Sequence, residues 1–585
     1  MSFILNLSNG ERRARTFNRK ELSEKTFVFK VLNFCFEKIF IIQNKPLSIT
    51  QKNVRLIGRN YEHTFYLTTH FLLRFEILLK KIKIVSRNSP LAKIQALKVG
   101  TTIHTKFPTI DIIYCSKQSD GDLNPNQKLY SGNTTTGLFT HNISASISNE
   151  EFDIGVHSWK DVPIEPAFNT SIFGTIERGD MRDMLFLKKG SLTNLSNGNL
   201  NIFTSSPRRK YLSQKKLSNF LPFDNSEVNF MDIRGNIETR LKKFFESNVD
   251  GILIAKTAID RLLSKDYGSV ENEKHNKIKK YMQSSRWMIL PLSWFPTAPG
   301  QGAIGIEIHK SNTGAQKIVK HINNEKVFND VSDEKKILSQ YGGGCHQKIG
   351  VSIWRNKGLK LMSVCGETET GETLDNYEII NQKNANKNDG LKISDAFPVN
   401  ENEKRIFVRE DIDSFQRISE IKNSLFYISR KNVLDNKPKI HDSNLIWTSG
   451  LQSWIKAAKS GYWVNGSSES FGETTDFRIN SFVSSEMKKY KLSHSKSDSS
   501  NMDLIPVYKL EHRKMTADIS NKTHFYWMSS FAFDFYVNEY PEIKSKNHAC
   551  GPGKTYDHIL KVLRNSENLT KYLSYEDWKK SFESK

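Results

Sequence analysis

Residues 157–163 have the sequence His157-Ser158-Trp159-Lys160-Asp161-Val162-Pro163, directly after the apolar run Phe152-Asp153-Ile154-Gly155-Val156. The apolar run predicts a buried strand. Pro163 cannot donate to a central ladder, so the strand must end and the chain must turn before it. The turn places Lys160 and Asp161 at the carboxyl end of a strand, where open α/β sheets bind their ligands. Taken alone, an adjacent Lys and Asp are most often solvated loop charges, so the interpretation depends on the rest of the chain.

Three other segments combine a strand, a short turn and a helix start. Their capping residues are Ser89 before Pro90, Ser206 before Pro207, and Asn236. Ser and Asn are favoured helix N-caps, and Pro at the first helical position loses no hydrogen bond. Such helix starts offer free N–H groups to an anion. Arginines flank all three: Arg87, Arg208, Arg209, Arg234 and Arg240. Singly such arginines usually face water, but three similar units predict an α/β fold with an anion-lined cleft.

The pair Arg208-Arg209 carries a more specific prediction. Arginines are disfavoured by the helix dipole at a helix start, so the pair indicates an anion between the two guanidinium groups. Fixed guanidinium forks suit carboxylates, and a ligand with many carboxylates would use all of these arginines.

The chain is strongly basic, with a formal charge of +23 over 585 residues. The charge predicts an anionic partner, which could be nucleic acid, a membrane surface or a small molecule with several carboxylates or phosphates. A compositional bias toward Lys and Asn explains part of the excess. The five cysteines are far apart without a CxxC pair, which favours a reducing compartment and argues against a disulfide framework or a zinc ribbon. No metal site is predicted. No apolar run reaches about 18 residues, so no membrane span is predicted.

Two glycine-rich stretches follow the second α/β block. Thr297-Ala298-Pro299-Gly300-Gln301-Gly302-Ala303 predicts a hinge that returns the chain to the first block. Tyr341-Gly342-Gly343-Gly344-Cys345-His346 places Cys345 on a glycine-flanked loop. A lone Cys is usually a small buried hydrophobe, but this setting favours a reactive thiol or a point of covalent attachment.

These stretches, in this order, resemble hydroxymethylbilane synthase, also called porphobilinogen deaminase. The resemblance covers residues 82 to about 385 and also rests on Ser86-Arg87-Asn88-Ser89-Pro90-Leu91-Ala92, Thr204 to Arg209, and Arg234-Gly235-Asn236 with Thr239-Arg240. It implies two doubly wound domains like type II periplasmic binding proteins and a small α+β domain. The expected boundaries are 82–176 with 290–308 for domain 1, 177–289 for domain 2 and 309–385 for domain 3. Residues 1–81 form an extension whose role no motif indicates.

The family's chemistry implies roles for named residues. A dipyrromethane cofactor is expected on Cys345 through a thioether, and Asp161 is expected to stabilise the positive charge that develops on pyrrole nitrogen. Cofactor contacts are expected from Lys160, Ser206, Arg208 and Arg209. Substrate carboxylates are expected to meet Arg87, Ser89, Gln95, Arg234, Arg240 and Arg261. The sequence departs from the family at Thr136, where a lid lysine is usual, which puts lid contacts in doubt.

The C-terminal part begins after a polar linker, 386–399. Residues 400–585 resemble uroporphyrinogen-III synthase, an α/β family that closes hydroxymethylbilane into a ring. The resemblance rests on Asn444 to Gly450, His524 to Ser530, Trp463 to Ser467 and His548 to Tyr556. Cyclase candidates are Thr448, Ser449, Ser529, Gly553 and Thr555.

The resemblances together predict a cytoplasmic, monomeric enzyme of haem biosynthesis that acts on small molecules, with no nucleic-acid or membrane partner. Three alternatives stay open: a deaminase with an inactive C-terminal region, an anion-binding protein without catalysis, and a nucleic-acid-binding protein that would explain the charge.

Overall fold

The computed structural model describes residues 80–118, 140–165, 168–193, 199–223, 227–264, 272–342, 347–380, 392–400, 403, 407–498, 501–512 and 519–582. The predicted attachment residue Cys345 and the lid residue Thr136 lie outside these residues, as do residues 1–79. Within the described part, no helix has the length and apolar content needed to cross a membrane.

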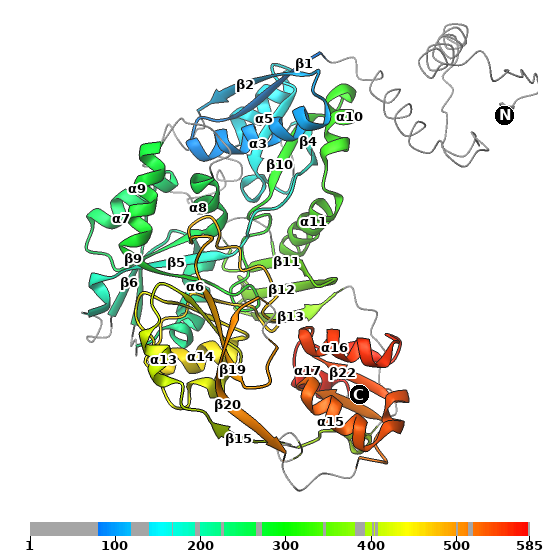
Figure 1. Ribbon diagram of the computed structural model, residues 1–585. Coiled ribbons are helices and arrows are strands. Elements are labelled where there is room, and N and C mark those ends of the chain that lie inside the picture. Colours follow the sequence, from blue (N-terminus) through cyan, green and yellow to red (C-terminus); the bar gives the residue numbers. More distant parts are fainter. Residues whose placement is uncertain are drawn as a thin grey trace, which may run out of the picture. The chain divides into compact units, whose positions relative to one another are not determined.

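The first sheet is a mixed one in which most strands run parallel (Figure 1). In sheet order its strands are β2 (Asp111–Lys117), β1 (Lys81–Arg87), β3 (Ile154–Ser158), β10 (Ile304–His309) and β4 (Thr170–Gly174). Strand β1 pairs in parallel with β2 and β3, whereas β10 is antiparallel to β3 and β4. The predicted return of the chain from the second block to the first is therefore confirmed.

Helices α3 (Pro90–Lys106), α5 (His141–Ser148) and α10 (Thr313–Ile322) pack on this sheet. Ser89 caps α3 by accepting a hydrogen bond from Ala92 N, and Pro90 is its first residue, as predicted. Helix α10 contacts α3 and β4. By packing, the first domain therefore extends to residue 322, beyond the predicted boundary at 308.

The second sheet repeats the order of the first. Its strands are β7 (Glu227–Met231), β6 (Asn199–Phe203), β8 (Gly251–Ala255), β5 (Asp183–Lys188) and β9 (Ser285–Ile289). Again one strand, β5, is antiparallel to both of its neighbours. Its helices are α6 (Pro207–Lys216), α7 (Ile237–Glu246), α8 (Lys256–Leu263) and α9 (Asn272–Gln283). The predicted caps Ser206 and Asn236 accept from Arg209 N and Thr239 N.

A small antiparallel sheet forms the third domain of the N-terminal half. Its strands are β11 (Gly350–Asn356), β12 (Leu359–Glu367) and β13 (Thr373–Ile379), and α11 (Glu325–Ser339) packs on it through Leu338. The mixed α/β class predicted for this half is confirmed.

The C-terminal region contains two α/β units. One has the parallel strands β14 (Ala396–Phe397), β21 (His524–Trp527), β22 (Asn547–Cys550) and β23 (Leu569–Lys571), with helices α15 (Ser530–Glu539), α16 (Lys554–Leu563) and α17 (Tyr575–Lys580). Because Ala396 pairs with His524, the region begins before residue 400, and the last residues of the predicted linker belong to this sheet.

The other C-terminal unit is a six-stranded sheet. Its strands are β15 (Phe407–Asp411), β20 (Asp503–His512), β19 (Lys489–His494), β16 (Leu425–Ile428), β17 (Leu445–Thr448) and β18 (Gly466–Ser467), and its helices are α13 (Phe415–Glu420) and α14 (Leu451–Lys459). The antiparallel pair β15 and β20 belongs to the two segments that connect this sheet to the four-stranded one. The chain thus crosses twice between the two units.

The six-stranded unit shares its hydrophobic core with the second deaminase-like domain. Phe220 and Trp454 meet edge to face with ring centroids 5.0 Å apart, and Trp454 Nε1 donates to Phe220 O at 3.1 Å. At the sheet edges, Ile289 N donates to Asn465 O at 2.9 Å. Apolar residues of both regions belong to the same buried clusters. The two halves of the chain are therefore packed together as well as joined by a linker.

Candidate active site

The turn Trp159–Asp161 follows β3 at the carboxyl end of the strand, as the sequence predicts. Trp159 is buried against Ala303 and Val331, and its backbone N donates to Ala303 O at 3.1 Å. Lys160 and Asp161 are half-buried. The buried indole therefore anchors the turn, while the two charged residues keep access to solvent.

The glycine-rich hinge packs directly on this turn. Gly300 has a φ of 77°, and a Cβ on it would lie 3.1 Å from Lys160 N. Both the left-handed backbone and the close approach favour glycine. The hinge is therefore packed closely against the backbone of Lys160.

The carboxyl end of β1 lies beside the same turn, because β1 and β3 are parallel neighbours. This places Arg87, the last residue of β1, and Ser89, the cap of α3, at the edge of the sheet that carries Asp161. Gln95 is buried, and its Nε2 donates to Ser158 Oγ at 2.9 Å. Gln95 therefore supports the residue at the base of the turn, a contact that the substrate-binding prediction did not include.

The predicted anion between Arg208 and Arg209 is a side chain of the protein itself. Arg208 donates to Asp183 Oδ2 at 2.9 Å, and Arg209 donates to Asp183 Oδ1 at 2.7 Å. Arg208 also donates to Pro296 O at 2.8 Å. Burial alone would raise the pKa of Asp183, but the charges of Arg209 and Arg208 outweigh it and hold this pKa well below its usual range. The arginine pair is thus first a buried ionic cluster, which corrects the prediction of a ligand as the counter-ion.

The remaining predicted arginines differ in setting. Arg240 is half-buried and its Nε donates to Gly235 O at 2.7 Å, which closes the turn that carries Arg234. Arg261 is buried and donates to Gly302 O at 2.7 Å. Arg261 therefore holds the hinge, a role that differs from the predicted contact with substrate.

Two buried carboxylates that the sequence reasoning did not single out organise this part of the molecule. Glu334 receives both terminal nitrogens of Arg178, at 2.8 and 2.9 Å, and Gly300 N at 2.8 Å. Glu307 lies 2.7 Å from His157 Nε2 and accepts from Thr170 Oγ1 at 2.5 Å. For Glu307 the available signal was an acidic residue inside an otherwise apolar strand, because such residues are buried only when paired. Glu334 lies among other charged residues of α11, so the sequence offered no such signal for it.

The arginine cluster keeps hydrogen-bonding capacity for a ligand with carboxylates. The Nε atoms of Arg208 and Arg209 are buried and have no hydrogen-bond partner. The start of β11 is close by, since a Cβ on Gly350 would lie 3.0 Å from Arg208 Cδ. Gly350 follows the predicted attachment residue Cys345 by only a few positions. The residues present therefore fit a polycarboxylate group attached to that loop.

The cyclase candidates fall into two groups. Thr448 is fully buried and donates to Gly466 O at 3.5 Å, so it belongs to the core of its sheet. Ser449 and Gly553 both lie against Ser470: Ser470 N donates to Ser449 O at 2.7 Å, and a Cβ on Gly553 would lie 3.2 Å from Ser470 O. Ser529 caps α15, and Thr555 lies in the first turn of α16. Ser449 and Gly553 thus both lie against Ser470, where the two C-terminal units touch.

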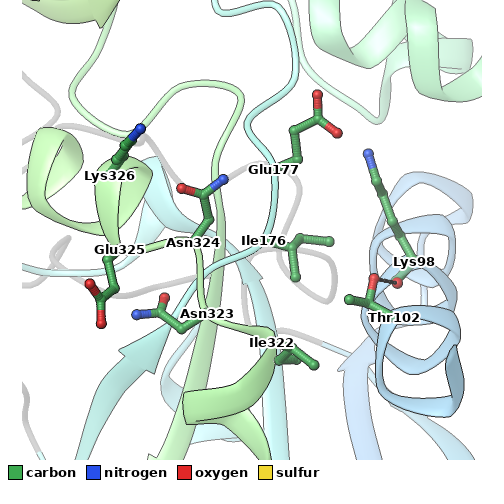
Figure 2. Close-up of a pocket in the computed structure, with 9 residues that line it drawn as sticks. All are labelled: Lys98, Thr102, Ile176, Glu177, Ile322, Asn323, Asn324, Glu325 and Lys326. Atoms are coloured by element: carbon green, nitrogen blue, oxygen red, sulfur yellow. Dashed lines mark hydrogen bonds between the residues drawn. The ribbon is translucent and has the colours of Figure 1, made fainter. Parts of the chain in front are cut away.

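A cavity of about 620 Å³ opens on another part of the molecule. Figure 2 shows its lining residues, among them Lys98 from α3, Glu177 from the segment between β4 and β5, and Asn323 from the connection between α10 and α11. None of the predicted site residues lines it. The cavity is therefore separate from the cluster around Asp161 and Arg208.

Comparisons with known proteins match the N-terminal half. A family model described as "Porphobilinogen deaminase, dipyromethane cofactor binding domain" matches residues 82–317. The "Probable porphobilinogen deaminase" of Sulfurisphaera tokodaii is 33% identical over 271 residues, which cover 46% of this chain and 81% of that protein. The porphobilinogen deaminase of Chlorobium phaeobacteroides is 31% identical over 301 residues, covering 51% of this chain and 87% of that protein. With a match to most of the length of such relatives, this chain belongs to the porphobilinogen deaminase family.

Proposed function

We propose that the N-terminal half is a hydroxymethylbilane synthase, which joins four porphobilinogen units into linear hydroxymethylbilane with release of ammonia. The observation that carries the proposal is the half-buried Asp161 at the carboxyl end of β3, within a family whose members bind dipyrromethane. When bound, the dipyrromethane supplies the pyrrole carbon to which each incoming unit is joined.

The residues of this chain have three tasks in the proposed reaction. Asp161 stabilises the positive charge that develops on pyrrole nitrogen as ammonia leaves, because a fixed carboxylate at the point where charge develops lowers the barrier. Lys160, Arg87 and Arg234 supply cations for acetate and propionate groups. The spare Nε donors of Arg208 and Arg209 serve the carboxylates of the cofactor. Cys345 is the proposed attachment point.

The intact mass of the purified chain tests the first proposal. We expect a covalent addition equal to two pyrrole units on the full-length protein and its loss in Cys345→Ser. A matched control is Cys115→Ser, which changes a half-buried thiol on β2. An addition that persists in Cys345→Ser would reject this residue as the attachment point.

We further propose that the C-terminal region is a uroporphyrinogen-III synthase that closes hydroxymethylbilane with inversion of the last ring. Its support is the arrangement of two α/β units joined by two crossing segments, with the candidates Ser449 and Gly553 at their contact. The resembled family works in a cleft between two such domains.

Product analysis tests the second proposal. Hydroxymethylbilane free in water closes to uroporphyrinogen I, so the intact protein supplied with porphobilinogen should yield mostly isomer III. Gly553→Val crowds Ser470 and should shift the product toward isomer I. Gly551→Val is the control, because a Cβ there meets nothing within 4 Å. If the unchanged protein yields isomer I, the proposed cyclase activity is rejected, whereas the proposed deaminase activity is not affected.

A further inference from the structure

The loop Ser468–Phe477 follows β18. Residues close together in this loop contact several domains of the molecule. Glu469 contacts the segment between β9 and the hinge. Phe471 is 1% exposed and packs with Leu359 and Leu361 of β12. Glu473 forms ion pairs with Lys491 of its own unit and Lys554 of the four-stranded unit. One C-terminal loop therefore contacts the segment that leads into the hinge, the third domain and both C-terminal units.

The contact at Glu469 is the one nearest to the chemistry. Its Oε1 accepts from Ser293 N at 2.9 Å and from Ser293 Oγ at 2.6 Å, and its Oε2 accepts from Leu292 N at 3.3 Å. Three donors on two carboxylate oxygens hold the turn Pro291–Phe295 in one conformation. The same loop contacts the segment between β4 and β5, which is the other connection between the first and second domains, because Arg182 donates to Phe477 O at 2.9 Å.

The held turn leads directly into the predicted active site. Pro296 O accepts from Arg208, and Gly300 packs on the backbone of Lys160. Pro296 lies three positions and Gly300 seven positions after Ser293. A shift of the turn would therefore move the arginine cluster and the Asp161 turn together.

The backbone of the loop is strained where these contacts are made. Glu469 has a φ of 46° and Ser470 a φ of 71°. Left-handed conformations are unfavourable for non-glycine residues, and they persist where the surroundings determine them, often at functional sites. Two adjacent residues in this conformation indicate that the position of the Glu469 carboxylate is imposed by its contacts.

We propose that Glu469, in the C-terminal region, is a positioning residue of the deaminase site. It fixes the Pro291–Phe295 turn, and through that turn it fixes the hinge on which Lys160, Asp161 and Arg208 depend. The inference rests on the proposed deaminase function and goes beyond it, because it makes porphobilinogen turnover depend on a residue outside the family's own domains.

The test compares Glu469→Gln with Glu542→Gln, a change of an exposed glutamate in the four-stranded unit. An amide offers one acceptor oxygen, and its NH2 group would face a backbone donor, so Glu469→Gln must lose part of the contact. We expect kcat per cofactor-loaded molecule to fall about tenfold or more, with a smaller change in KM, because Glu469 is not among the predicted substrate-binding residues. The distribution of enzyme-bound chain lengths should also shift, which partial unfolding alone would not cause.

Amide hydrogen exchange over residues 291–303 supplies a readout that does not need activity. Exchange should accelerate in Glu469→Gln and stay unchanged in Glu542→Gln. Unchanged exchange, or faster exchange with kcat and chain-length distribution equal to those of the control, would overturn the inference. An unchanged protein that consumes no porphobilinogen would instead reject the proposed deaminase function, and the exchange rates alone would then decide whether Glu469 positions the hinge.

Discussion

Single residues in the N-terminal half illustrate how charge is kept in the interior. Asp183 is almost fully buried and pairs with two guanidinium groups, one on each carboxylate oxygen, while Glu334 pairs with Arg178. Removal of one partner from such a cluster leaves uncompensated buried charge, which is far more costly than loss of an exposed ion pair. Asp161, in contrast, is half-buried and follows a buried strand, which suits the proposed role of a group that meets substrate.

Asp161→Asn keeps the shape of the side chain and removes its charge. We expect cofactor assembly to survive, while chain elongation slows on the order of 10²-fold or more, because the developing positive charge loses its counter-ion. Intact mass reports assembly, and single-turnover measurement of porphobilinogen addition reports elongation. Hydroxymethylbilane formation at a near-normal rate would exclude the role assigned to Asp161.

Asp183 should contribute to acid sensitivity with a defined sign. Its folded-state pKa lies well below its usual range, so between the unfolded and folded pKa values the unfolded chain binds more protons. Stability is therefore fully present above about pH 4 and is lost as pH falls toward the folded pKa. Asp183→Asn should lower stability at pH 7 by about 3–5 kcal/mol and should weaken this acid dependence.

Denaturant midpoints between pH 3 and pH 7 would measure both effects. Asp232→Asn is the control, since Asp232 pairs with Lys210 on the surface with a side chain that is 72% exposed. Equal acid dependence in Asp183→Asn and the unchanged protein would contradict the assignment of the buried ionic cluster.

Among the elements, the two connections between the first and second domains decide how these domains are held. One is the segment between β4 and β5, and the other contains the hinge. Gly302 O accepts from Gly179 N at 3.1 Å and from Arg261 at 2.7 Å, which ties the two connections together. The same hinge meets Glu334 through Gly300 N. These hydrogen bonds join the hinge to the segment between β4 and β5, to α8 and to α11.

Gly302→Ala should disrupt this element. Gly302 has a φ of 85°, and its Cβ would lie 2.6 Å from Gly179 O. The left-handed backbone alone costs an alanine roughly 1–2 kcal/mol, and the overlap adds to that cost, so the thermal midpoint and kcat should both fall. Gly190→Ala is the matched control, because a Cβ there meets nothing within 4 Å. A Gly302→Ala protein as stable and active as the control would show that the hinge tolerates the change.

At the scale of the whole molecule, the C-terminal region completes the core of the second deaminase domain. Side chains of both halves, such as Trp287 and Trp447, belong to one buried cluster. Full burial of a large apolar side chain contributes about 1.5–3 kcal/mol, so the shared clusters stabilise both halves. The chain is not a deaminase with an independent appendage.

A chain that ends near residue 390 should therefore be poorly soluble, because it exposes the apolar side chains that the six-stranded unit covers. Size-exclusion chromatography and specific activity would measure this. The control is a full-length protein with a protease site within 386–390: after cleavage, both pieces should elute together with activity retained. A soluble, monomeric and fully active 1–390 fragment would contradict the shared core.

Local features could be predicted from the sequence because they depend on near neighbours. The strand before Trp159, the caps Ser89, Ser206 and Asn236, and the placement of Asp161 at a strand's carboxyl end all follow from periodicity and from the chemistry of helix starts. The α/β class follows from the alternation of such units. None of these features requires knowledge of a distant partner.

The tertiary structure alone decided which distant groups meet. That Asp183 occupies the space between Arg208 and Arg209, that Gln95 binds Ser158, and that Glu469 holds the turn before the hinge are contacts between residues far apart in the chain. A local pattern shows that a charge or an amide needs a partner, but it does not name that partner. The shared core has the same origin, since an apolar face in the sequence does not reveal which other face will cover it.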